Sequence, residues 1–251
     1  MRIRTRLRGW KNSPIQIRGR VCDVISIIIP TYNERNNICR VIRKLSKALK
    51  GYEHEIIVVD DNSPDGTAEK AREMAKKYPV RVFQRKKRLG LATAIVYGFR
   101  KARGEILGVI DADMQHTPEL ARELVEAVRT NHDLAIASRY VEGGKIVDWP
   151  FYRKIISKVA IYIARPFTDL KDPVSGYFFL KKSVIDGVRL EAIGYKILLE
   201  ILVKGKYGSV VEIPYTFQGR TEGRSKLGLG TLFDYMRLIF RLYLYKMGLA
   251  C

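Results

Sequence analysis

The sequence predicts an α/β protein with a mainly parallel, Rossmann-like sheet and helices on both of its faces. Two observations support this. Short runs rich in β-branched residues alternate with longer segments of helical pattern, which is typical of parallel sheets. Polar and acidic clusters also follow several of these runs directly, as expected where the strands of such a sheet end at one ligand-binding edge.

The elements alternate regularly up to Ser138. We expect helices between most of the strands, and Thr117 followed by Pro118 is a favourable helix start. The expected strands cover residues 24–29, 55–59, 80–83, 106–110 and 134–137. The expected helices cover residues 36–49, 67–77, 91–102 and 118–130.

After Ser138 the alternation gives way to mixed aromatic and basic residues. We expect a strand at 177–180, a helix at 195–203, a strand at 209–217, a glycine-rich loop at 219–230 and a final amphipathic helix at 231–247. No Pro-, Gly- or Ser-rich linker divides the chain. The sequence therefore predicts one domain over residues 21–251, preceded by a basic arm at residues 1–20 that carries six arginines and no acid.

The formal net charge of +20 indicates an anionic partner. Nucleic acid, anionic lipid and phosphorylated substrates all satisfy that requirement. A basic nucleic-acid-binding domain is disfavoured, because the basic residues are spread along the whole chain and no nucleic-acid motif is present. We therefore expect no nucleic-acid partner. No uncharged apolar run reaches the roughly 18 residues of a membrane-spanning helix, and no signal peptide fits the start.

The acidic triplet Asp111-Ala112-Asp113 follows one expected strand. Two carboxylates at i and i+2 can face one cation if the chain bends there, and Gln115 offers a third oxygen. Oxygen ligands favour Mg²⁺ or Mn²⁺. Taken alone, the two acids are explained equally well as the solvated cap of a strand. Three other polar clusters at the same edge favour the metal site.

Asp60-Asp61 and the following Ser-Pro-Asp-Gly stretch also read as a turn. The turn accounts for Pro64, Asp65 and Gly66, whereas two acids after a buried strand suggest a carboxylate that accepts hydrogen bonds from a nucleotide. Kinase, ATPase and dinucleotide-oxidoreductase readings lack support, because neither a phosphate loop nor a Gly-x-Gly-x-x-Gly follows the first strand. A Ser-His-Asp hydrolase is equally unsupported.

Several motifs resemble family 2 glycosyltransferases with the GT-A fold: Ile-Ile-Pro-Thr-Tyr-Asn-Glu at 28–34, Val-Val-Asp-Asp-Asn-Ser-Pro-Asp-Gly-Thr at 58–67, Asp-Ala-Asp-Met-Gln-His at 111–116 and Ser-Arg-Tyr at 138–140. Later stretches are similar to dolichol-phosphate mannose synthases: Trp-Pro-Phe-Tyr-Arg-Lys at 149–154, Asp-Pro-Val-Ser-Gly-Tyr-Phe at 172–178 and Arg-Thr-Glu-Gly-Arg-Ser-Lys-Leu at 220–227. The resemblance runs from about Val24 to Met247.

The resemblance implies an inverting transfer of mannose from GDP-mannose to dolichyl or another polyprenyl phosphate, on the cytoplasmic face of a membrane. The donor sugar is the least specific part, and UDP-glucose or another nucleotide sugar is the alternative. Some members carry transmembrane helices after the catalytic domain, whereas this sequence ends at Cys251. We therefore expect a peripheral protein, with a membrane-anchoring partner subunit as one way to reach the lipid. The basic arm lies outside the family pattern.

The resemblance also assigns residues by position. The nucleotide sugar would be held by Pro30, Tyr32, Glu34, Val59, Asp61, Asp111, Ala112, Asp113, Gln115, Arg220 and Lys226. The divalent metal, Mg²⁺ or Mn²⁺, would be bound by Asp111, Asp113 and Gln115. The catalytic residues would be Asp113, Arg139, Arg220 and Lys226, and the acceptor phosphate would be bound by Arg139, Arg153 and Ser157.

A lipid phosphate needs little help from a general base, because its second pKa of about 6 leaves it ionised near neutral pH. Its approach to a nucleoside diphosphate needs cations, which arginines and a metal supply. Two apolar stripes flanked by basic residues predict helices in a membrane interface, near 151–163 and 231–247. The alternative is that each stripe packs on the sheet. The stripe residues are Phe151, Ile155, Val159 and Ile163 in the first helix, and Met236, Ile239, Phe240, Tyr243 and Met247 in the second.

Overall fold

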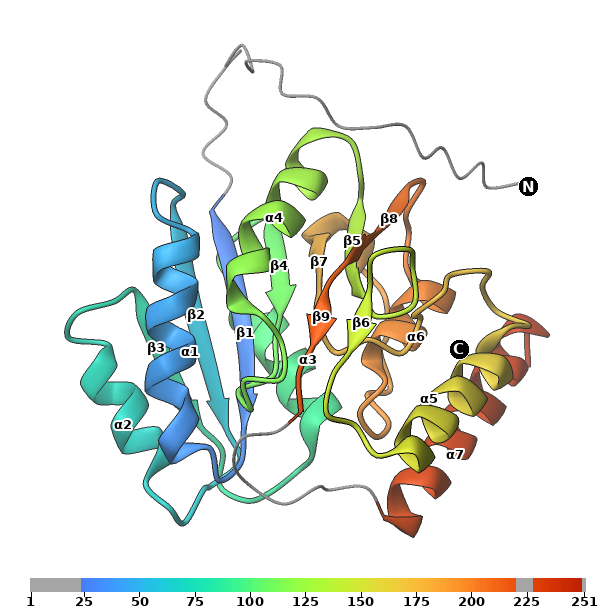
Figure 1. Cartoon of the computed structure of the whole chain (residues 1–251), viewed down its shortest axis with the longest axis horizontal. Coiled ribbons are helices and arrows are strands. Elements are labelled where there is room, and N and C mark those ends of the chain that lie inside the picture. The colour runs from blue at the N-terminus through green and yellow to red at the C-terminus, as the bar shows by residue number, and fades with distance from the viewer. Residues whose placement is uncertain (1–23, 220–227, 250–251) are drawn as a thin grey trace.

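The computed structural model describes residues 24–219 and 228–249. They form a seven-stranded sheet in the order β3-β2-β1-β4-β7-β5-β8, and a two-stranded sheet of β6 and β9 (Figure 1). β7 is antiparallel to both neighbours, whereas the other pairings are parallel. The strands are β1 Ile25–Thr31, β2 His54–Asp60, β3 Val80–Gln84, β4 Ile106–Val109, β5 Leu134–Ser138, β6 Lys145–Ile146, β7 Phe178–Lys181, β8 Val210–Pro214 and β9 Thr216–Phe217.

Helices cover both faces of the large sheet, as the alternating pattern predicted. On one face lie α1 (Arg35–Ala48), α2 (Thr67–Met74) and α4 (Ala121–Thr130), and on the other lie α3 (Leu91–Lys101) and α6 (Ile197–Lys204). Strand β1 explains how both cores form, because Ile27 and Ile29 pack into the first and Ile28 into the second. Two short 3₁₀ turns, η1 (Pro118–Leu120) and η2 (Lys182–Val184), complete this part.

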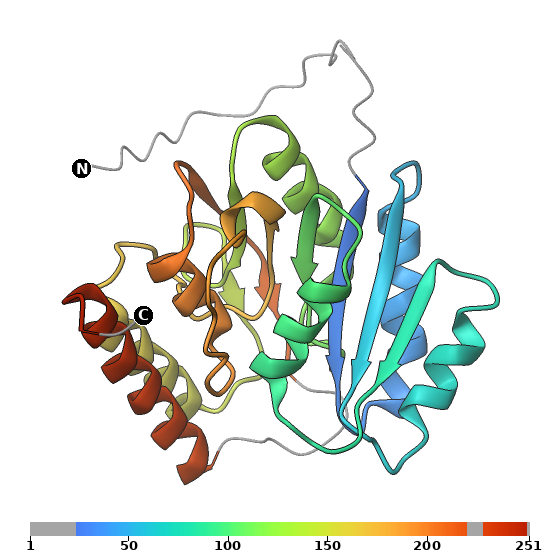
Figure 2. The same cartoon turned by 180° about the vertical axis from the view of Figure 1, so that it is seen from behind.

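Helices α5 (Phe151–Ala164) and α7 (Leu229–Lys246) lie side by side at the end of the molecule opposite β3 (Figures 1 and 2). A third hydrophobic cluster joins them to α6 and includes Ile161, Leu199, Leu238 and Leu242. These two helices therefore attach to the sheet through α6, and each keeps another face turned outward.

The structure differs from the expected elements in three places. β7 runs antiparallel, a direction that a short apolar run cannot reveal. The strand expected over 209–217 divides at Tyr215 into β8, on the large sheet, and β9, on the small one. The helical turn begins at Pro118 as expected, but Thr117 does not cap it: the Thr117 hydroxyl donates to the Thr216 carbonyl at 3.4 Å.

Within residues 24–219 and 228–249, no helix has both the length and the apolar character needed to cross a membrane.

Candidate functional site

The polar clusters predicted at one sheet edge do converge. The segments that follow β1, β2, β4 and β5 line a cavity of about 290 Å³. It lies beyond the carboxyl ends of these strands, where parallel sheets bind ligands. The residues assigned from the sequence that line it are Pro30, Tyr32, Glu34, Asp61, Asp111, Ala112, Asp113, Gln115, Arg139 and Arg153.

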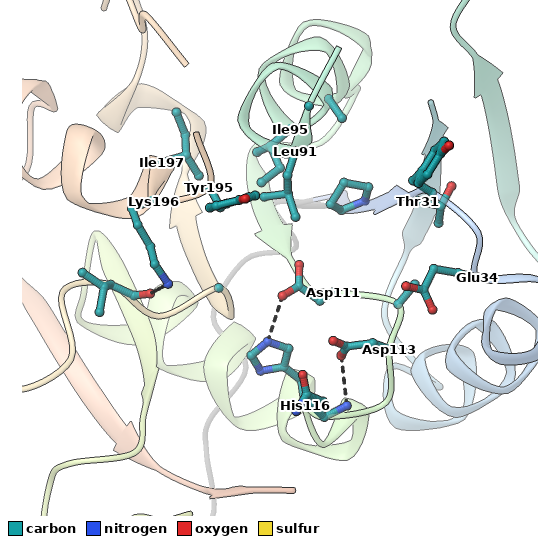
Figure 3. A pocket seen from close by; sticks show the side chains of 18 of the residues that line it. Thr31, Glu34, Leu91, Ile95, Asp111, Asp113, His116, Tyr195, Lys196 and Ile197 are labelled. Carbon is teal, nitrogen blue, oxygen red and sulfur yellow. Dashed lines mark hydrogen bonds and ion pairs between the residues drawn. The ribbon is translucent and has the colours of Figure 1, made fainter. Parts of the chain in front are cut away.

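The acidic triplet bends at the point where a shared cation would require it. Met114 has φ 61°, in the left-handed region that non-glycine residues rarely adopt, and this directs the chain away from the line of β4. Asp113 Oδ1 accepts a hydrogen bond from the Gln115 backbone N–H at 3.1 Å. Figure 3 shows the Asp111 and Asp113 carboxylates lying close to each other in the cavity.

The His116 ring forms a polar contact with the Asp111 carboxylate. Its Nε2 lies 3.3 Å from Asp111 Oδ2, and its Nδ1 lies 3.0 Å from the Tyr215 hydroxyl (Figure 3). Burial raises the pKa of Tyr215 well above its usual value, so this hydroxyl keeps its proton and donates to Nδ1. The imidazole then presents its Nε2–H to Asp111. The rings of Tyr177, Tyr215 and Phe217 surround His116 and fix its orientation.

The donors at this position suit a hard divalent cation. Two carboxylates and one amide provide oxygen ligands only, as Mg²⁺ and Mn²⁺ prefer. Gln115 donates through its side-chain nitrogen to the Gln218 carbonyl at 3.1 Å, so a ligand role would use its oxygen. No group of three His, Cys, Asp or Glu side chains suited to a metal occurs in the described part of the chain. The remaining ligands would therefore be water or substrate phosphate, as is usual for Mg²⁺.

The two acids after β2 have different partners. Asp60 is fully buried and closes a turn, accepting from the Thr31 hydroxyl at 3.0 Å and from the Ser63 N–H at 2.8 Å. Asp61 pairs with Arg85 and accepts the Leu89 and Gly90 N–H groups at 3.0 and 2.8 Å. Asp61 lines the cavity, but its carboxylate holds the loop that precedes α3.

That loop brings a further cation to the cavity. The Arg88 guanidinium carbon lies 4.3 Å from the centroid of the Tyr32 ring, and both residues line the cavity. Arg88 is exposed, and Lys86 and Lys87 beside it are exposed as well. The mouth of the cavity at Tyr32 is therefore strongly basic.

Arg139 is buried and forms an ion pair with Asp172. Its Nε and Nη2 donate to the two Asp172 oxygens at 2.7 and 2.8 Å. Burial alone would lower the pKa of Arg139, but Asp172 raises it, so the guanidinium stays charged. Its Nη1 is the guanidinium nitrogen that Asp172 leaves for a ligand. The rings of Tyr140, Trp149 and Phe217 pack around this guanidinium.

Three buried polar atoms beside the cavity have no hydrogen-bond partner among the described residues: Arg153 Nε, Trp149 Nε1 and the Tyr140 hydroxyl. Arg153 and Trp149 line the cavity itself. Buried donors normally have partners, because leaving one unsatisfied costs about 1–3 kcal/mol. These donors therefore indicate a polar ligand.

Two of the residues assigned from the sequence do not line the cavity, and two others lie outside the described residues. Val59 does not line the cavity, because its side chain belongs to the core between β2 and α3. Ser157 lies one turn after Arg153 on α5 but lines neither the cavity nor the groove described below. Arg220 and Lys226 lie outside the described residues.

An apolar groove of about 670 Å³ runs between α5 and α7. Its walls include Ile156, Val159, Leu232 and Tyr235. At its inner end it shares residues with the polar cavity: Arg153, Tyr195, Lys196 and Thr231 line both. A ligand with a polar head and an apolar tail therefore has a continuous binding surface.

Most of the exposed large hydrophobic side chains in the described part of the chain lie on α5 and α7. On α5, Phe151 is 77% exposed and Tyr162 78%; on α7, Phe233 is 70% exposed and Phe240 62%. A patch of this kind marks an interaction surface. The stripe expected on α7 needs one correction: Ile239 is buried, because it faces Tyr235 and Leu242 in the third cluster, so it is not part of the exposed surface.

Sequence reasoning missed several residues of the site. Arg88 and Lys196 belong to no recognised motif and line the cavity only because the fold brings their loops there, and Arg85 contributes through its pairing with Asp61. Asp172 lay within a quoted motif, but its pairing with Arg139 crosses 33 positions. Tyr215 and His116, which are also in contact, are separated by 99 positions in the sequence.

Comparisons with known proteins agree with this geometry. Residues 26–189 match the family described as "Glycosyl transferase family 2". The chain is 53% identical over 222 residues to a dolichol-phosphate mannosyltransferase of Pyrococcus furiosus, which covers 87% of this chain. The match spans 63% of that relative, less than two thirds of its length. It is 37% identical over 236 residues to the dolichol-phosphate mannosyltransferase of Saccharomyces cerevisiae, covering 89% of this chain and 88% of the relative.

Solved structures show the same fold. The crystal structure of glucosyl-3-phosphoglycerate synthase from Mycobacterium tuberculosis with Mn²⁺, UDP-glucose and glycerol 3-phosphate superposes with a TM-score of 0.66. The alignment covers 91% of this chain and 82% of that one at 18% identity, so it bears on the fold alone. The GT-A fold expected from the sequence is confirmed.

Proposed function

Because the chain belongs to glycosyl transferase family 2, and within it to the dolichol-phosphate mannosyltransferases, we propose that it transfers mannose from GDP-mannose to dolichyl or another polyprenyl phosphate. The product is a lipid-phosphate mannose with inverted, β, configuration. Residues 21–251 are the proposed catalytic domain. Mg²⁺ or Mn²⁺ is the proposed metal.

One observation carries the proposal: the polar cavity and the apolar groove meet at Arg153, Tyr195, Lys196 and Thr231. A nucleotide sugar fits the polar side, where carboxylates for a metal and cations for phosphate lie together. The groove offers space for an isoprenoid chain. A soluble acceptor would have no use for a groove of this size and polarity, whereas a polyprenyl phosphate needs both halves.

The reaction balances without a protein base. An acceptor phosphate oxygen forms a bond to the anomeric carbon of mannose, while the bond from that carbon to the β-phosphate oxygen breaks and GDP leaves with the electron pair. The acceptor is already ionised near neutral pH. A metal bound at Asp111 and Asp113 supplies positive charge to the diphosphate. Arg88, Arg139 and Arg153 add cations from three separate elements and orient the anionic groups.

Contact with a membrane surface follows from the same proposal, because the acceptor's long chain resides in lipid. The exposed apolar residues of α5 and α7 would enter the interface, and Lys154, Lys158 and Arg237 on these helices would favour anionic headgroups. The resulting location is peripheral, on the cytoplasmic face. A membrane-anchoring partner subunit stays an expectation from the sequence.

The proposal is tested by measuring sugar transfer to dolichyl phosphate from labelled GDP-mannose and from labelled UDP-glucose side by side. We expect lipid-soluble product mainly from GDP-mannose. Equal or greater use of UDP-glucose would contradict the proposed donor while leaving the acceptor intact. Transfer to dolichol itself, the uncharged alcohol, is the negative control for the phosphate.

A further inference from the structure

Lys196 lies where the polar cavity meets the apolar groove, and it lines both. It precedes α6 directly and lies across the cavity from Asp111 and His116 (Figure 3). Its ammonium group donates to the Val174 carbonyl at 3.0 Å. In the part of the chain that the structure describes, no carboxylate lies within 4.0 Å of this ammonium group.

A lysine at the other end of α6 provides a comparison. Lys204, the last residue of that helix, is buried, but it pairs with Glu200 at 2.9 Å and with Glu191 at 3.1 Å. A buried charge is normally compensated in this way, because taking it out of water is costly. Lys196 has a neutral carbonyl instead.

The acids nearest to Lys196 are already engaged. Asp172 is bound through both oxygens by Arg139, and Asp111 faces His116. Burial, and then the charge of Arg139, lower the pKa of Lys196 from 10.5 to about 8. The charges of Asp172 and Asp111 offset this only in part, so an anionic ligand at this corner of the cavity would stabilise the charged form of Lys196 further.

We propose that Lys196 binds the phosphate group of the lipid acceptor, at the inner end of the groove that receives the chain. The inference rests on the proposed function and assigns the acceptor's headgroup to a residue outside the sequence motifs. A phosphate monoester placed there would take one hydrogen bond from the ammonium group. Arg153, which lines the same junction, can supply another.

The experiment is calorimetric binding of farnesyl phosphate, farnesol and inorganic phosphate to the wild-type chain and to Lys196→Gln. We expect the wild type to prefer farnesyl phosphate over farnesol. Lys196→Gln should weaken the binding of farnesyl phosphate by roughly tenfold or more, the usual effect of losing a hydrogen bond to a charged group. The affinities for farnesol and for GDP with Mn²⁺ should change less than twofold.

Lys204→Gln is the matched control, because it removes a lysine at the far end of α6, away from the cavity. It should lower the melting temperature without changing the preference for the phosphate. An unchanged farnesyl phosphate affinity in Lys196→Gln would overturn the inference. So would an equal loss of GDP binding, which would place Lys196 with the donor. Wild-type binding of inorganic phosphate as tight as that of farnesyl phosphate would contradict a lipid headgroup.

The failure of the proposed function looks different. If the wild type binds GDP with Mn²⁺ but shows no affinity for farnesyl phosphate, the acceptor class itself is wrong, whatever the variants do. If the wild type binds farnesyl phosphate and Lys196→Gln binds it equally well, the proposed role of Lys196 is wrong, but the proposed acceptor class is not contradicted.

Discussion

Gly176 lies so close to Asp111 that a Cβ at position 176 would be 3.0 Å from Asp111 Oδ2 and 3.5 Å from His116 Nε2. The glycine therefore leaves room for the contact between Asp111 and His116. Gly176 and Asp111 are 65 positions apart in the sequence, yet they meet at one carboxylate.

Gly176→Ala should displace the Asp111 carboxylate by a few tenths of an ångström and weaken metal binding. We expect the Mn²⁺ concentration needed for half-maximal activity to rise about tenfold, since small misplacements at a reacting centre are costly. Titration of activity with Mn²⁺ measures this. Gly208→Ala is the control, because a Cβ there would meet only Asp133 Oδ2 at an ordinary 3.7 Å. An unchanged Mn²⁺ dependence in Gly176→Ala would contradict Asp111 as a ligand.

Arg153→Ala should weaken the binding of the lipid acceptor more than the binding of the donor. Arg153 lines the junction of the cavity and groove, and its buried Nε has no partner among the described residues. We expect KM for dolichyl phosphate to rise about tenfold or more, the order expected for a hydrogen bond to a charged group, while KM for GDP-mannose stays nearly constant. Steady-state kinetics with each substrate varied will check this.

Lys47→Ala is the control for Arg153→Ala. Lys47 is an exposed cation on α1, away from α5 and α7, and lines neither cavity nor groove. Its removal should leave both KM values within about twofold, since isolated surface charges contribute little. If Arg153→Ala leaves the acceptor KM unchanged, Arg153 has only a structural role.

The exposed face of α7 should bind lipid. Phe233→Ser together with Phe240→Ser removes two exposed aromatic side chains, each worth roughly 1.5–3 kcal/mol when fully buried. We expect flotation with anionic vesicles to fall at least tenfold while the melting temperature stays constant. Val147→Ser, an exposed apolar side chain outside both helices, should have no effect. Equal flotation of the double variant and wild type would rule out α7 as the membrane contact.

Asp133 should make stability depend on pH in the acid range. The hydrogen bond from Lys181, at 2.9 Å, and the N–H groups of Gly208 and Ser209 lower its pKa from 3.8 to about 2. A depressed folded-state pKa stabilises the protein above the unfolded value, and this stabilisation is lost as the pH falls from about 4 to about 2.

Urea unfolding of wild type and Asp133→Asn at several pH values tests this. The difference in unfolding free energy should be at most about 2 kcal/mol above pH 5, the energy of that pKa shift, and should shrink towards pH 2. A difference that stays constant from pH 7 to pH 2 would mean that the Asp133 charge does not contribute.

Much of the fold was predictable, because strands buried on both faces carry a local signature. The apolar run of β1 and the helical periodicity of α1 are examples, and both were expected within a few residues. The direction of β7 was not, since four residues pair equally well in either sense. The break at Tyr215 depends on β6, whose partner lies about seventy positions further along the chain.

The site was predictable where it consists of short motifs at strand ends. Asp111 and Asp113 follow β4 directly, so sheet topology alone placed them at the edge. Residues that act through distant partners were not accessible: His116 requires Tyr215, and Arg139 requires Asp172. Val59 has a core side chain because adjacent residues of a strand point to opposite faces, so its assignment to the nucleotide stays a prediction.

The most direct test measures transfer of label from GDP-mannose into lipid-soluble product with dolichyl phosphate and Mg²⁺ or Mn²⁺, for the wild type and for Asp113→Ala. Circular dichroism establishes that the variant is folded. We predict product with the wild type, no product in excess EDTA, and at least a hundredfold loss in folded Asp113→Ala, comparable to the removal of a main electrostatic contact at a reacting centre. Wild-type rates in Asp113→Ala, or no lipid product from the wild type, would contradict the metal-assisted transfer proposed for this chain.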